Sequence, residues 1–292
     1  MSVDEAGTEQ GAGGADEPGW DVDPDDESGV AVVAAVGRQI RAWREAAGMR
    51  ACEFGAAIGY GEDLVRKVEG GRRIPWPEFL DRSDEVLGAG GKIAAMKRDV
   101  ASVRYPKKVR DMAGVEAKAV ELAAYVAHGL HGLLQTPGHA RALFEARQPP
   151  YSQDEVERMV AGRVARQAIF ERTPSPALSF VQEESALRRP IGGTLEWRRQ
   201  LERLLEIGRL RNVTLQVMPT YREAHPGMDG DIDVLKFKDG SAVGRSHGAF
   251  NGRRVTEAKQ LRILELRYGV IRAEALTTRE TLALIEQVLG ET

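Results

Sequence analysis

The side chains best suited to catalysis or metal binding are few and scattered in this chain. The five histidines stand at positions 128, 131, 139, 225 and 247, and the one cysteine is Cys52, within a short helical segment. His128 and His131 have a spacing at which two imidazoles could hold a metal, but no HExxH or CxxC motif supplies further ligands. No phosphate-binding glycine loop is present either. The pattern predicts no enzymatic activity, no metal and no cofactor.

A set of polar residues in the C-terminal half could instead bind a ligand or a partner. Gln135 and Thr136 come at a predicted helix start, where free amides could meet a polar group. Glu184 and Arg188 stand one helical turn apart after a predicted strand. One interpretation is a simple helix cap and solvent-exposed ion pairs. The alternative is an internal pocket in which four charged side chains converge: Arg141, Arg166, Glu184 and Arg188.

Short helical patterns follow one another between residues 30 and 100. Apolar residues recur at helical spacing, and glycines end the first three segments. Helices are predicted over residues 31–47, 50–58, 62–69 and 77–87, and a fifth begins at residue 92. Helices this short and this close together can build only a compact all-helical bundle.

The connection between the second and third predicted helices is a tight turn, Ile58-Gly59-Tyr60-Gly61. Gly59 stands where such a turn needs a residue of positive φ. Three helices joined in this way let the third lie in the major groove of DNA while the second braces it. The residues expected on the internal faces are Phe54, Ile58, Leu64, Val65 and Val68.

Residues 36–87 resemble the Xre/Cro-type helix-turn-helix family. The matching positions are residues 48–49 (GM), 54–59 (FGAAIG), 65–69 (VRKVE), 71–73 (GRR) and Pro75. The resemblance implies a DNA-binding domain whose recognition helix covers about residues 62–69.

The resemblance also implies which residues contact DNA. Side chains of the recognition helix can reach guanine edges or phosphates, the two arginines after it would bind phosphate oxygens, and the amides that begin the second helix would cap a phosphate. In chain order these residues are Arg50, Ala51, Glu62, Asp63, Arg66, Lys67, Arg72 and Arg73.

Two positions depart from the family pattern. Ala51 stands where the family usually has glutamine, and Glu62 and Asp63 replace neutral polar residues at the start of the recognition helix. The two acids suit the positive end of the helix dipole. They repel phosphate, however, unless they accept a hydrogen bond from a cytosine amino group.

Beyond residue 112 the pattern combines helices with strands. Alternating apolar residues predict strands at residues 178–181, 213–218 and 232–237, with a hairpin turn at Asp239-Gly240. Helices are predicted over residues 115–130, 137–147, 153–171, 195–210, 259–268 and 278–289.

The predicted fold class is α+β: an N-terminal all-α five-helix domain, then a mainly helical domain with a small, mostly antiparallel sheet. The predicted boundaries are 1–29 (disordered acidic tail), 30–100 (DNA-binding domain), 101–112 (linker) and 113–290 (sensing or interaction domain).

The C-terminal half carries a second resemblance. Residues 132–137 (GLLQTP) and 140–143 (ARAL) resemble the hallmark of a domain that follows the helix-turn-helix in many actinomycete regulators. His131 and His139 replace the proline and tyrosine usual there. This resemblance implies a C-terminal domain of unknown function, and some such regulators are antitoxin-like and pair with a small partner protein.

Composition bounds the remaining possibilities. The net charge is −3, but residues 1–30 hold ten acidic and no basic residues, so the other 262 residues carry −3 + 10 = +7. An acidic segment so poor in apolar residues is expected to be disordered. It is either a solubilising tail or a competitor of DNA for the basic surface. With one cysteine and no apolar run long enough to span a membrane, the expected location is the cytoplasm.

The sequence therefore predicts a transcriptional regulator that binds double-stranded DNA as a homodimer, with half-sites about one helical turn apart. Its C-terminal domain would sense a small-molecule effector or bind a protein. The alternative is an antitoxin-like interaction module that binds a small partner protein and has weak or no DNA binding.

Overall fold

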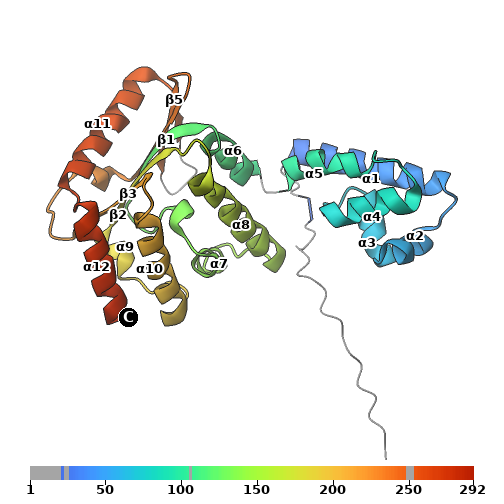
Figure 1. Cartoon of the computed structure of the whole chain (residues 1–292), viewed down its shortest axis with the longest axis horizontal. Coiled ribbons are helices and arrows are strands. Elements are labelled where there is room, and N and C mark those ends of the chain that lie inside the picture. The colour runs from blue at the N-terminus through green and yellow to red at the C-terminus, as the bar shows by residue number, and fades with distance from the viewer. Residues whose placement is uncertain (1–20, 23–25, 105–106, 248–252) are drawn as a thin grey trace, which may run out of the picture. The chain divides into compact units, whose positions relative to one another are not determined.

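The computed structural model describes residues 21–22, 26–104, 107–247 and 253–292 (Figure 1). The chain divides into two compact units, Met1–Arg104 and Tyr105–Thr292. Most of the predicted disordered tail, residues 1–29, lies outside the described residues. Its last three residues are helical, since α1 begins at Glu27. The backbone carbonyl of Asp26 accepts the first helical hydrogen bond, 2.8 Å from the Val30 amide.

The N-terminal unit contains five α-helices in its described part, as predicted. They are α1 (Glu27–Ala46), α2 (Ala51–Ile58), α3 (Glu62–Glu69), α4 (Pro77–Leu87) and α5 (Lys97–Val103), and the 3-10 turn η1 (Ala94–Met96) precedes α5. Their inward faces form one apolar core, which includes Val33, Ile40, Phe54, Val65, Val68, Phe79 and Leu80.

The predicted linker, residues 101–112, is largely helical. It contains the end of α5 and the beginning of α6 (Lys107–Glu116), and the two units divide between Arg104 and Tyr105. Lys107 and Lys108, within the predicted linker, begin α6.

The C-terminal unit alternates helices and strands. Its first half contains β1 (Ala119–Val126), η2 (Gly132–Leu134), α7 (Pro137–Glu145), α8 (Gln153–Ala165), η3 (Arg166–Glu171), β2 (Ala177–Glu183) and α9 (Glu184–Leu187). Its second half contains α10 (Thr194–Gly208), β3 (Val213–Met218), η4 (Pro226–Asp229), β4 (Asp231–Phe237), β5 (Ala242–His247), β6 (Arg253–Val255), α11 (Ala258–Glu274) and α12 (Thr278–Glu291).

The sheet is mixed, so the prediction of a mostly antiparallel sheet was wrong. In the described part its strand order is β3-β2-β1-β4-β5-β6. β1 pairs with β2 and β2 with β3 in parallel, whereas β4, β5 and β6 continue the sheet antiparallel. The parallel pairs arise because α7 and α8 connect β1 to β2 and α10 connects β2 to β3, and parallel strands need such crossovers.

The helix predicted over residues 115–130 was also wrong, because residues 119–126 form strand β1. Its sequence, AVELAAYV, is rich in residues that favour helices. The segment lies between β2 and β4, and its side chains alternate between two covered faces of the sheet. Leu122 and Ala124 belong to one apolar cluster and Tyr125 to another. Burial on both faces decides the conformation there, and propensity does not.

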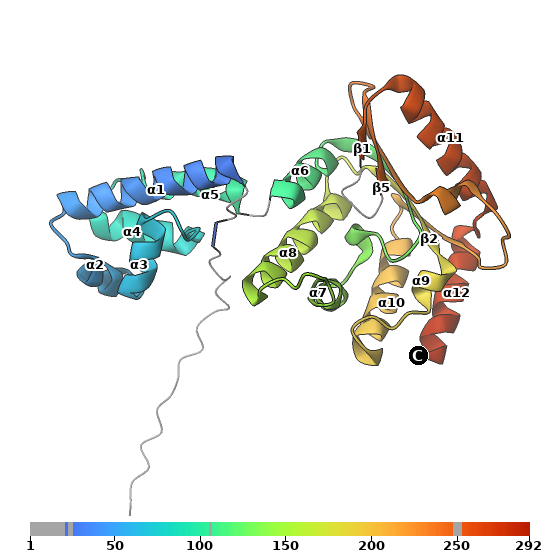
Figure 2. The ribbon, with the colours of Figure 1, turned by 180° about the vertical axis from the view of Figure 1, so that it is seen from behind.

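Helices cover the two faces of this sheet. On one face α10 and α12 pack over an apolar cluster that includes Phe180, Leu201 and Leu215. On the other face α11 packs over a smaller cluster that includes Val181, Val234 and Tyr268. Figures 1 and 2 show α11 on the opposite side of the strands from α10 and α12.

Candidate nucleic-acid interface

Two glycines set the position of the recognition helix α3. Gly59 ends α2 at φ 81°, a left-handed conformation that strains any other residue, and this reverses the chain within the predicted turn. Gly37 of α1 lets the backbones of α1 and α3 approach closely, because a Cβ there would lie 2.3 Å from the Val68 carbonyl oxygen. The helix-turn-helix geometry therefore depends on these two missing side chains.

A buried ion pair fixes α3 against α1. The Arg44 guanidinium donates to both carboxylate oxygens of Glu69, Nε to Oε1 at 2.6 Å and Nη2 to Oε2 at 2.9 Å. It also donates to the Met49 carbonyl at 2.8 Å, where α1 leads into α2. The hydrogen bonds that Arg44 donates to Glu69 raise the pKa of Arg44. The pair joins α1, α3 and the connection between α1 and α2, and no local sequence pattern predicted it.

The exposed side of this assembly is hollowed. A hollow of about 660 Å³ is lined by five arginines and two glutamates, together with Ala51, Cys52 and Gly70. The arginines are Arg41, Arg44, Arg50, Arg66 and Arg72, and the glutamates are Glu62 and Glu69. Five of the eight predicted DNA contacts thus meet in one place: Arg50, Ala51, Glu62, Arg66 and Arg72. Arg41 and Arg44, three residues apart on α1, could have been found from their helical spacing.

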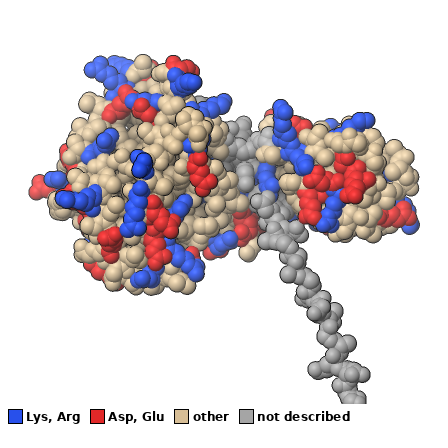
Figure 3. All heavy atoms as spheres, in the orientation of Figure 1, with Lys and Arg blue, Asp and Glu red and all other residues tan. Residues whose placement is uncertain are grey.

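The basic side chains of α3 are paired with the acids that depart from the family pattern. Arg66 Nη2 lies 2.6 Å from Glu62 Oε1, and Lys67 Nζ lies 2.7 Å from Asp63 Oδ2. The hydrogen bond from Lys67 lowers the pKa of Asp63. All four side chains are more than 40% exposed. On the face of this unit seen in Figure 3, acidic and basic side chains lie side by side and do not form a uniformly basic surface.

The start of α2 differs from the prediction in one respect. The Arg50 amide, predicted to cap a phosphate, already donates to Glu53 Oε2 at 2.9 Å. The Arg50 guanidinium donates to Glu53 Oε1 at 2.7 and 2.9 Å, and these bonds lower the pKa of Glu53. The Arg50 side chain nevertheless stays 76% exposed at the rim of the hollow. A phosphate there would meet its side chain and would not bind its amide.

The two arginines after α3 have different surroundings. Arg72 is exposed and lines the hollow. Arg73 is only partly exposed, and its Nη1 lies 3.1 Å from Asp21 Oδ1. The Val22 amide also donates to the Arg72 carbonyl at 3.2 Å. A described part of the acidic N-terminal segment therefore touches a residue predicted to bind phosphate.

In the C-terminal unit, Gln135 and Thr136 both form hydrogen bonds with protein groups. Gln135 is 4% exposed, donates to the Leu130 carbonyl at 2.7 Å and accepts from Arg163 Nη1 at 2.6 Å. Thr136 caps α7, since its hydroxyl oxygen accepts from the His139 amide at 3.2 Å. The capping interpretation of these residues fits the structure.

The four side chains predicted to converge in an internal pocket do not meet. Each has its own partner: Arg141 pairs with Glu157, and Arg166 pairs with Glu116 at 2.6 Å. Glu184 pairs with Arg188 at 3.0 Å and also accepts from the amide and hydroxyl of Thr220. The structure therefore gives these four side chains separate partners and does not bring them together in one pocket.

Two of the histidines, His131 and His139, are buried against other protein groups. His131 Nε2 lies 3.7 Å from Asp233 Oδ1, and its Nδ1 accepts from the Leu133 amide at 3.3 Å. His139 is 1% exposed beside Trp197, and burial lowers its pKa to about 4. Within the described residues, no three His, Cys, Asp or Glu side chains gather where they could hold a metal ion.

Each of the two units matches a known protein family. Residues 35–95 match a family described as a helix-turn-helix domain, which supports a DNA-binding protein. No match was found among curated proteins or among solved structures. None of the helices in the described parts of the chain is both long and apolar enough to cross a membrane. Residues 109–287, more than half of the chain, match the family described as a domain of unknown function (DUF5753), and the chain therefore belongs to that family.

Proposed function

We propose that this protein is a sequence-specific transcriptional regulator that binds double-stranded DNA through its N-terminal unit. The observation that carries the proposal is the hollow lined by five arginines beside the recognition helix. It brings together side chains from α1, α2, α3 and the segment after α3, which is the arrangement that a phosphate backbone and a base edge require.

The ion pairs of the recognition helix are compatible with this function. Exposed pairs at i,i+4 contribute only about 0.3–0.5 kcal/mol, so DNA can replace them at little cost. Arg66 and Lys67 would exchange carboxylate oxygens for guanine or phosphate oxygens. Glu62 and Asp63 would then select bases that offer an amino group and weaken binding elsewhere.

We further propose that two copies bind one operator, as Xre-type proteins are expected to do. Two helix-turn-helix units on one face of B-DNA would contact half-sites separated by about one helical turn, roughly 34–36 Å. The protein would act without catalysis, in the cytoplasm.

The first experiment is selection from a randomised DNA library with the full chain, followed by salt titration on the best site. The proposal predicts a defined motif and an affinity that falls steeply as salt rises, because arginine–phosphate contacts release counterions. Weak and sequence-blind binding would contradict it and favour the alternative, an interaction module that binds a small partner protein.

Three variants then assign the roles of individual arginines. Arg66→Gln should cost about 1–3 kcal/mol and relax specificity at one base position. Arg72→Gln should weaken all sequences alike and lower the salt slope by about one. Arg98→Gln is the matched control, because Arg98 is exposed on α5 and does not line the hollow. Equal behaviour of the first two variants would reject the separation of base and phosphate contacts.

A further inference from the structure

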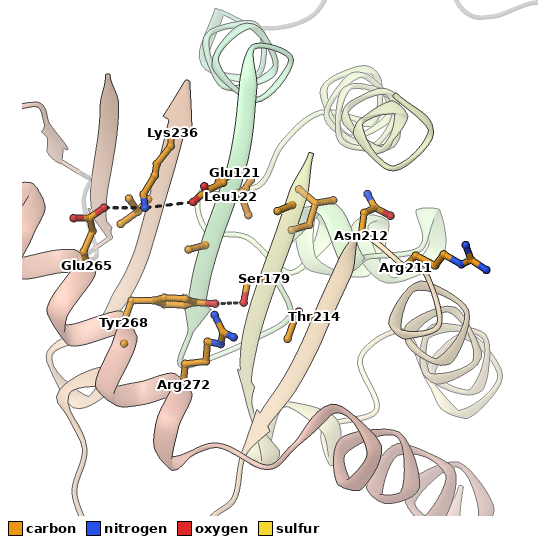
Figure 4. A pocket seen from close by; sticks show the side chains of 15 residues that line it. Glu121, Leu122, Ser179, Arg211, Asn212, Thr214, Lys236, Glu265, Tyr268 and Arg272 are labelled. Atoms are coloured by element: carbon orange, nitrogen blue, oxygen red, sulfur yellow. Dashed lines mark hydrogen bonds and ion pairs between the residues drawn. The ribbon is translucent and has the colours of Figure 1, made fainter. Parts of the chain in front are cut away.

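A cavity of about 510 Å³ lies in the C-terminal unit between α11 and the sheet, at the amino ends of β2 and β3 (Figure 4). Its floor is made by small side chains, Ala123 of β1, Ser179 of β2 and Thr214 of β3. Tyr268, Gly269 and Arg272 of α11 form the facing wall. Its volume is within the range of small-molecule sites. None of the predicted binding residues lines it.

The hydrogen bonding of the floor leaves a donor for a ligand. The Tyr268 hydroxyl donates to Ser179 Oγ at 2.7 Å. Burial raises the pKa of Tyr268 to about 12, so this hydroxyl keeps its proton at neutral pH. Because Ser179 Oγ accepts this bond, its own hydrogen remains available to a group in the cavity. The neighbouring Thr214 hydroxyl lines the same floor.

Positive charge is distributed unevenly around the cavity. At one end Lys236 Nζ lies 3.3 Å from carboxylate oxygens of both Glu121 and Glu265, so this cation is compensated. Arg272 has no carboxylate within ion-pair distance among the side chains that the structure describes. Figure 4 shows its guanidinium directed along the floor towards Ser179 and Tyr268. The end of the cavity near Arg272 is therefore positive and rich in donors.

We infer that this cavity binds a small organic anion, with a phosphate or carboxylate group held by Arg272 and the Ser179 hydroxyl. A guanidinium and a hydroxyl donor are the groups that recognise such anions. The polar remainder of the ligand would lie towards Glu121 and Lys236, which supply both acceptors and donors. This inference concerns the C-terminal unit alone and does not depend on the proposed DNA binding.

The test is calorimetric titration of the full chain with inorganic phosphate and, separately, with citrate, at an ionic strength kept constant with chloride. At least one of the two probes should bind, and Arg272→Gln should weaken it by roughly tenfold or more, since charge-assisted hydrogen bonds are lost. Ser179→Ala should weaken the same probe by a smaller factor. Preference for phosphate or for citrate distinguishes a phosphorylated ligand from a carboxylic acid.

Arg262→Gln is the matched control, because Arg262 is exposed on the same helix and does not line the cavity. It should bind the probe like the unaltered protein. Among the described residues the Arg272 side chain makes no hydrogen bond to another element. Gln216 donates to its backbone carbonyl, which the substitution keeps. Circular dichroism should therefore show Arg272→Gln to be folded.

No binding of either probe up to tens of millimolar, or equal binding by the Arg272 and Arg262 variants, would overturn the inference. DNA binding, measured separately, is expected to be the same in both variants.

Discussion

The two units of this protein use arginine in different ways. In the N-terminal unit most basic side chains near the hollow pair with an acid three or four residues away and stay exposed, as Arg66 does with Glu62. In the C-terminal unit Arg188, Arg199 and Arg203 also pair locally, but Arg166 joins two elements that are distant in the sequence. Arg166 and Glu116 are 50 residues apart, and their side chains are only 10% and 3% exposed.

This difference separates exposed arginines, which can exchange a carboxylate for another anion, from buried arginines, which cannot. Breaking an exposed local pair costs only tenths of a kcal/mol, so a phosphate can take the place of the carboxylate. Breaking a buried pair leaves an uncompensated charge in the interior, at a cost of about 3–5 kcal/mol. Arg44 and Glu69 are the exception in the N-terminal unit, and they position α3 without being exposed for exchange.

The first prediction concerns the buried ion pair of the C-terminal unit and has the largest effect. Arg166→Gln should lower the free energy of unfolding by about 3–5 kcal/mol, because it strands Glu116 in the interior. The measurement is urea-induced unfolding followed by far-ultraviolet circular dichroism. The control is Arg209→Gln, whose partner Glu286 lies 3.2 Å away in an exposed pair, and it should cost less than about 0.5 kcal/mol. A similar loss in both variants would contradict the distinction.

The next prediction concerns buried His139 in the C-terminal unit and the dependence of stability on pH. Burial, with a smaller contribution from Arg163, lowers the pKa of His139 from 6.5 to about 4. Between these values the unfolded chain binds one proton more than the folded chain, so stability falls as pH falls. Between pH 7 and pH 5 this contribution amounts to about 2 kcal/mol. His139→Phe should remove it.

Thermal unfolding of both proteins across that pH range measures this difference. The control is His128→Phe, because His128 is exposed on the same unit. If His139→Phe leaves the loss of stability on acidification unchanged, His139 is not the group responsible.

A smaller effect is expected on DNA affinity when an exposed ion pair of the recognition helix is removed. Glu62→Gln should tighten non-specific DNA binding by roughly threefold, about 0.7 kcal/mol, because it releases Arg66 and removes a charge that repels phosphate. Fluorescence anisotropy with random duplex DNA measures it. Glu78→Gln is matched, since it breaks the exposed pair of Glu78 with Arg82 on α4, outside the hollow. A loss of affinity limited to one selected site would instead show that Glu62 reads a base.

The smallest effect concerns the contact between Asp21 and Arg73. Asp21→Asn should strengthen DNA binding by up to about twofold, since an exposed pair of this kind contributes at most about 0.5 kcal/mol. Glu85→Gln removes the same charge from an exposed position on α4 and serves as the control. Identical changes in the two variants would mean that net charge alone matters and that the acidic segment does not compete at Arg73.

The N-terminal unit was predictable because its signals are local. Helical spacing, the glycines after the first three helices and the turn at Gly59 all act within a few residues. The C-terminal unit was predicted less well: residues 119–126 have helical composition, and their strand conformation depends on β2 and β4, which come more than fifty residues later. The partner of Arg166, fifty residues away, was equally invisible to local patterns.

The helix-turn-helix, the exposed character of the recognition helix and the acidic N-terminal composition could be predicted, because each follows from residue type and short-range spacing. The order of the strands, the partners of the buried arginines and the cavity beside Tyr268 and Arg272 became visible only in the folded protein. These depend on which distant segments pack together, and burial free energy, which chooses among those packings, is a property of the assembled fold.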